Sequence, residues 1–133
     1  MSSAKSQITH VFQLGEYDCA VAALAIATGL AYEAVLPSFA ALIERQQTPG
    51  ISRIVAWLES RRFKCMLRSG AQPAFAPSHI AKVLWECPHY VAVDAHGRVF
   101  DPYPLYEGYS GGHDSLDHPD FSEVFWTLGI WPA

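Results

Sequence analysis

The stretch from Asp18 to Gly29, which reads DCAVAALAIATG, constrains the fold of this chain more than any other. It is apolar on nearly every face of a helix, whereas a surface helix would carry a polar stripe. Asp18 is a residue type that caps helix N-termini, and Gly29 suits the left-handed position that follows a helix C-terminus. We therefore predict a buried central helix whose small side chains let other backbones approach closely.

The rest of the chain divides into a helical part and a strand-rich part. Helices are expected over 32–36, 38–47 and 51–62. Pro37 is expected to stop the first of them, and Ser38 is a candidate cap for the second. Strands are expected over 63–68, 82–85, 89–94 and 98–101. The last apolar segment, 121–131, receives no assignment. Helices followed by antiparallel strands predict an α+β fold with the N-terminal helix packed on a small antiparallel sheet.

No repeat, low-complexity block or linker divides the 133 residues, so we predict one domain over 1–133. The net charge of −4 and the dispersed Lys and Arg argue against nucleic acid as a partner. The N-terminus lacks the apolar region of a signal peptide, and the apolar stretch 19–30 is too short to span a membrane. Three cysteines at unrelated spacings indicate no disulfide framework. These features predict a cytoplasmic protein without membrane association.

Cys19 lies in the first turn of the predicted helix. Unpaired backbone N–H groups and the helix dipole stabilise a thiolate at that position, which favours a nucleophilic role. The neighbouring carboxylate of Asp18 opposes a second negative charge unless its side chain points away. The alternative is that Cys19 is a small buried residue, the usual fate of a free cysteine.

A predicted hairpin brings a base and a carboxylate together. A three-residue loop at 95–97 pairs Asp94 with Arg98, so that His89 and Asp101 become diagonal neighbours on the same face of the sheet. A two-residue loop would separate them to opposite faces, because side chains alternate with period two. A histidine held by a carboxylate can act as the base for a thiol nucleophile. Alternatively, His89 is a hydrogen-bonded residue at a strand end and Asp101 opens an Asp-Pro turn.

Gln13 lies six residues before Cys19. Its side-chain amide is a candidate donor to a developing oxyanion, together with the backbone N–H of Cys19. A glutamine alone in a loop is more often solvated, so Gln13 has weight only jointly with Cys19 and the hairpin.

These residues resemble the papain-like cysteine peptidases, and among them the family that removes double-glycine leaders from bacteriocins. The stretch QLGEYDCAVAALA is similar to that family's Gln-x5-Cys nucleophile helix, and HYVAVDAHGRVFDP is similar to its hairpin with His and Asp-Pro. The resemblance implies a papain-like fold, Cys19 as nucleophile, His89 as general base and acid, Asp101 as the orienting carboxylate and Gln13 as oxyanion donor. It also implies a peptide or protein substrate, a thioester intermediate, and no metal or organic cofactor. Leader-removing enzymes are usually fused to a membrane exporter, which we do not expect here, and papain has Asn where this chain has Asp101.

Three alternatives stay open at this point. The same triad would also serve an acyltransferase of the transglutaminase kind. Alternatively, it would be catalytically inactive in a papain-like binding module. A zinc site formed by Cys19, Cys65, Cys87 and His89 is disfavoured because structural zinc ligands usually come in closely spaced pairs. The His/Asp-rich segment 111–120 matches no calcium loop and is expected to be a solvated loop. The sequence indicates neither an oligomeric state nor a substrate sequence.

Overall fold

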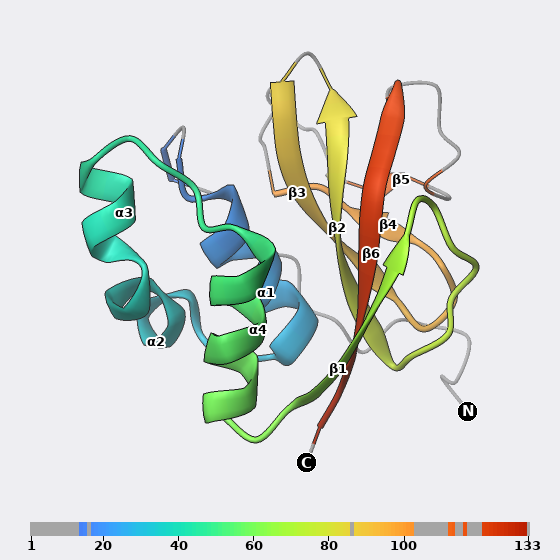
Figure 1. Cartoon of the computed structure of the whole chain (residues 1–133), viewed down its shortest axis with the longest axis horizontal. Coiled ribbons are helices and arrows are strands. Elements are labelled where there is room, and N and C mark those ends of the chain that lie inside the picture. Colours follow the sequence, from blue (N-terminus) through green and yellow to red (C-terminus); the bar gives the residue numbers. More distant parts are fainter. Residues whose placement is uncertain are drawn as a thin grey trace.

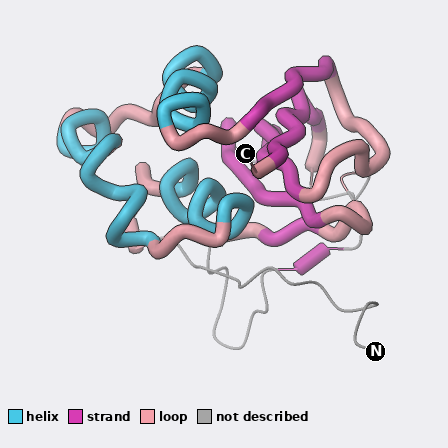
Figure 2. Tube along the Cα trace, turned by 90° about the horizontal axis from the view of Figure 1, so that it is seen from below, coloured by secondary structure: helices cyan, strands magenta, loops and turns pink. Residues whose placement is uncertain are grey.

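The computed structural model describes residues 14–15, 17–85, 87–102, 112–113, 116 and 121–132, with the backbone alone at 85, 87, 112 and 113. The helical elements are α1 (Cys19–Thr28), α2 (Tyr32–Val35), the 3-10 helix η1 (Leu36–Ser38), α3 (Ala40–Glu44) and α4 (Ile51–Ser60). The strands are β1 (Lys64–Ser69), β2 (Ser78–Trp85), β3 (Cys87–Asp94), β4 (Val99–Phe100), β5 (Gly112–His113) and β6 (Glu123–Trp131). The helices gather on one side of the strands, as Figures 1 and 2 show from two directions. The predicted α+β class is confirmed.

Helix α1 is buried along its length, from Cys19 to Ala27. It packs on β2 and β3 (Figure 1). Gly29 follows it in the left-handed conformation, with φ of 77°, and its N–H bonds to the carbonyl of Ala25 at 3.0 Å. The predicted central helix and its glycine end are confirmed, because an Ala-rich segment without a polar face has no other stable environment.

Of the two predicted helices around Pro37, the first is confirmed to within one residue, since α2 ends at Val35, and the second differs. Pro37 does not end the helical path, because it lies in the first turn of η1, where its missing N–H costs nothing. Helix α3 is shorter than the predicted 38–47. Ser38 does not cap it, since its hydroxyl instead accepts a hydrogen bond from the indole N–H of Trp57 at 3.0 Å.

The described strands form one antiparallel sheet in the order β1-β6-β2-β3-β4-β5. The apolar segment 121–131, which sequence reasoning left unassigned, supplies β6 between β1 and β2. Strand β1 is less buried than its alternating pattern predicts, and the Leu67 side chain is 50% exposed. The reason is position, since β1 ends the described sheet and has a described partner on one side alone.

The sheet contributes to two apolar cores. Ile80, Tyr90 and Leu128 pack with α1 and α4 in the larger core. Val83, Val91, Val93 and Val99 pack with Leu116 and Phe121 in a second cluster. In the described part of the chain no single helix is long and apolar enough to cross a membrane; α1 and the segment 32–38 reach that length and composition only as a pair bent by 114°.

Candidate active site

The β3–β4 hairpin has the predicted register. Ala92 pairs with Phe100 and Val93 with Val99, and the N–H of Asp94 bonds to the carbonyl of Arg98 at 3.0 Å. The loop therefore has three residues, 95–97, and its last residue, Gly97, has φ of 86°. This loop type, with a left-handed glycine at its end, is a common three-residue hairpin connection.

His89 and Asp101 meet as this register requires. The imidazole Nε2 lies 2.6 Å from Oδ1 of Asp101. Both residues are buried, with 5% and 1% of their surfaces exposed. In these surroundings a hydrogen bond between a charged acceptor and the ring is strong and fixes the ring orientation.

Asp94 stabilises the turn that sets this register, and sequence reasoning did not single it out. Its Oδ1 accepts hydrogen bonds from the backbone N–H groups of His96 and Arg98, both at 2.9 Å. Its Oδ2 accepts one from Nε of Arg98 at 3.2 Å. An Asp that begins a turn is a known signal for such side-chain-to-backbone bonds, so the motif DAHGR could have identified it.

The Cys19 side chain is the second hydrogen-bond partner of His89. Burial disfavours the imidazolium, but the hydrogen bonds and charges of Asp101 and Cys19 outweigh it and raise the pKa of His89 to about 9. Because Nε2 faces Asp101, Nδ1 is the ring nitrogen left for the thiol. The structure thus brings three of the four predicted site residues into one hydrogen-bonded chain, from Cys19 through His89 to Asp101.

The Asp18 carboxylate points away from this chain of groups. It is 3% exposed and makes no hydrogen bond to the first turn of α1. Its oxygens accept hydrogen bonds from the backbone N–H groups of Leu14 (2.7 Å) and Gly15 (2.8 Å) and from the hydroxyl of Tyr32 (2.7 Å). The expected conflict with a negative charge on Cys19 is therefore reduced, because the Asp18 oxygens are directed toward these three donors and not toward the first turn of α1.

Other candidate residues have mixed outcomes. Gln13 lies outside the described residues, as does most of the segment 111–120. Cys65 packs against the larger core, and burial, followed by the charge of Glu59, raises the pKa of its thiol to about 11. Within the described residues no group of three His, Cys, Asp or Glu side chains is placed to hold a metal ion.

Tyr90 is a neighbour of the site that the sequence did not indicate. Burial, and next the charge of Cys19, raise the pKa of its hydroxyl, which donates a hydrogen bond to the carbonyl of Pro49 at 2.5 Å. This bond ties β3 to the segment that leads into α4.

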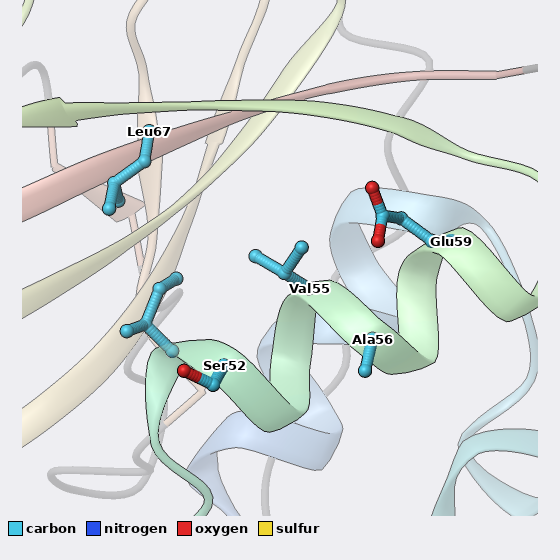
Figure 3. A pocket seen from close by; sticks show the side chains of 6 residues that line it. Ser52, Val55, Ala56, Glu59 and Leu67 are labelled. Carbon is cyan, nitrogen blue, oxygen red and sulfur yellow. The ribbon is translucent and has the colours of Figure 1, made fainter.

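Between α4 and β1 lies a mainly apolar pocket of about 370 Å³, lined by Ile51, Ser52, Val55, Ala56, Glu59 and Leu67. Figure 3 shows Leu67 extending from β1 toward α4, and Val55 extending from α4 toward β1.

The sequence matches no protein-family model, and no curated protein matches it.

Proposed function

We propose that this chain is a papain-like cysteine hydrolase that cleaves a peptide or isopeptide bond. The observation that carries the proposal is the buried imidazole of His89, hydrogen-bonded to Cys19 on one side and to Asp101 on the other. A nucleophile, a base and a group that orients the base are the three parts that thiol catalysis requires. Their order along the chain and their elements, a helix N-terminus and a hairpin, agree with the resemblance to leader-removing peptidases.

The resting pair forms when the proton of Cys19 passes to His89, which then keeps it at neutral pH until the amine leaves. The thiolate attacks the carbonyl carbon of the substrate, and the backbone N–H of Cys19 and the amide of Gln13 stabilise the oxyanion. The imidazolium of His89 then donates its proton to the amine nitrogen as the C–N bond breaks, which leaves a thioester on Cys19. Water, deprotonated by His89, attacks the thioester and releases the carboxylic acid and the free thiol.

The raised pKa of His89 supports this sequence of steps. An imidazole with a pKa of about 9 remains protonated at neutral pH. It can therefore supply the proton that the leaving amine needs. Asp101 stabilises that charge and holds the ring, and the proposal calls for no metal or organic cofactor.

Alkylation of the three cysteines by iodoacetamide tests the nucleophile. We expect Cys19 to react well below pH 8 and much faster than Cys65, whose thiol has a pKa of about 11. His89→Ala should abolish this advantage, while His96→Ala, which removes an exposed histidine from the same hairpin, should leave it unchanged. Equal, slow labelling of Cys19, Cys65 and Cys87 would rule out the enzyme and favour a silent binding module.

Product analysis by mass spectrometry separates hydrolysis from acyl transfer. Peptides are incubated with the protein, with and without an added primary amine. Release of a free carboxylic acid at an unchanged rate in both mixtures supports a peptidase. Products that carry the added amine would instead support an acyltransferase that uses the same triad.

A further inference from the structure

The register of the sheet places four residues in one row across β1, β6, β2 and β3. Ser69 pairs with Trp126, Trp126 with Lys82, and Lys82 with Tyr90. Side chains of directly paired residues point to the same face of a sheet. Because Tyr90 belongs to the core on the helix side, Lys82 also lies on that side, between Trp126 and Tyr90.

Lys82 is a half-buried cation among aromatic rings. Its Nζ lies 5.8 Å from the ring centroid of Tyr90, and the rings of Tyr90 and Trp126 are also 5.8 Å apart. The ion pairs among the described residues are His89–Asp101 and Arg98–Asp94, and neither involves Lys82. Among the described acidic residues, Glu123 is close to Lys82 by register, since it pairs with Leu84 two positions further along β2, and it forms no ion pair with Lys82.

Lys82 is half-buried as a residue, and its ammonium group lies over the ring of Tyr90 without an ion pair to a described carboxylate. An incoming carboxylate would give this group a charge-assisted hydrogen bond, which the aromatic ring does not supply. Such a carboxylate would bind near the candidate site. Lys82 pairs with Tyr90, which belongs to the same core as Cys19, and the next pair along these strands is Val83 with His89.

We propose that Lys82 binds a carboxylate of the substrate, so that the enzyme selects polypeptides with a carboxylate close to the scissile bond. This inference rests on the proposed hydrolase function. The carboxylate belongs either to an Asp or Glu side chain or to the C-terminus of the substrate, and the two sources share the same chemistry.

Protection of Cys19 from iodoacetamide measures occupancy of the site without requiring turnover. Four peptide pools of matched length are compared: three are blocked at both ends and carry a central Glu, Gln or Lys, and the fourth carries Gln and a free C-terminal carboxylate. In the wild-type protein, the Glu pool should protect Cys19 at a concentration about 5- to 30-fold lower than the blocked Gln pool, the range for one partly exposed charge-assisted bond. The free-carboxylate Gln pool protects better than the blocked Gln pool if the C-terminus is the source.

Variants at Lys82 carry the decisive comparison. Lys82→Met keeps the apolar stem and should remove the advantage of the carboxylate pools, and Lys82→Glu should shift the preference to the Lys pool. Lys64→Met removes the same charge from the exposed start of β1 and should behave like the wild type. The proposal is overturned if the carboxylate pools and the blocked Gln pool protect Cys19 equally, or if no pool protects it. It is also overturned if Lys82→Met keeps the preference of the wild type. Carboxylate-dependent protection without cleavage of any pool would contradict the hydrolase and still support carboxylate binding by Lys82.

Discussion

His89 is the residue on which the chemistry of the site depends, and the described neighbours that raise its charge are Asp101 and Cys19. Burial alone would keep the ring neutral, whereas Asp101 and Cys19 hold it protonated. A raised pKa in the folded state means that His89 stabilises the fold fully below its unfolded pKa of about 6.5. That contribution is lost as the pH rises through about 9.

The pH dependence of peptide cleavage should reflect this charge. We expect kcat/KM to fall at alkaline pH with an apparent pKa near 9, because a neutral His89 cannot protonate the leaving amine. Asp101→Asn removes the carboxylate that raises the pKa of His89, so its alkaline limb should move to lower pH. The measurement is kcat/KM between about pH 5 and 10. An alkaline limb at the same pH in both proteins would contradict this assignment.

Asp18 and Tyr32 together hold the residues that precede α1 against α2. Tyr32→Phe removes one of three donors to a buried carboxylate and should lower the free energy of unfolding by about 1.5–3 kcal/mol. Glu33→Gln, an exposed change on the same helix, is the matched control and should cost less than about 0.5 kcal/mol. Urea unfolding measures both, and equal stabilities of the two variants would show that the Tyr32 hydroxyl contributes little.

The β3–β4 hairpin is the element that decides whether His89 and Asp101 meet. Its sequence carried enough local information for the register to be predicted, since the loop length and Gly97 define the turn. Strand β6 carried no such information. Its partner in β1 is far away in the chain, with Lys64 opposite Trp131, and apolar composition alone does not reveal such a pairing.

Substitution of Gly97 tests the hairpin. Gly97→Ala should lower the free energy of unfolding by about 1–2 kcal/mol, because φ of 86° places its Cβ in a strained conformation. No other atom lies within 4 Å of that Cβ, so the cost comes from the backbone alone. Gly97→Asn, a residue type that tolerates this conformation better, should cost less. Denaturant unfolding measures both, and an Asn variant less stable than the Ala variant would refute the backbone explanation.

At the scale of the whole molecule, His79 joins the loop that precedes β2 to strand β3. Its Nε2 accepts hydrogen bonds from the backbone N–H groups of Phe75 (3.0 Å) and Ala76 (3.1 Å), and Nδ1 donates to the carbonyl of Val93 at 3.2 Å. The ring is therefore neutral, with its proton on Nδ1. It holds the loop between β1 and β2 against the sheet, where Phe75 covers Gly129.

Acid should destabilise the protein through His79. Burial lowers the pKa of this ring, so its contribution to stability is present above the unfolded pKa of about 6.5 and declines as the pH falls below it. Protonation would set an N–H against two backbone donors. We expect the free energy of unfolding to decrease below about pH 6.5 in the wild type, and to depend less on pH in His79→Gln. Parallel pH profiles of the two proteins, measured by urea unfolding, would contradict this role.

The sequence by itself determined the features that depend on short segments: the buried α1 helix, its end at Gly29, the hairpin register and the α+β class. Each follows from residue periodicity or turn chemistry within a few residues. The tertiary structure alone decided where the Asp18 carboxylate points, that Cys19 contacts His89, that β6 enters the middle of the sheet, and that Lys82 lies beside Tyr90. The Cys19–His89 contact and the pairing of β6 join segments far apart in the chain. The other two features join nearer segments, and all four are selected by the packing of the whole core.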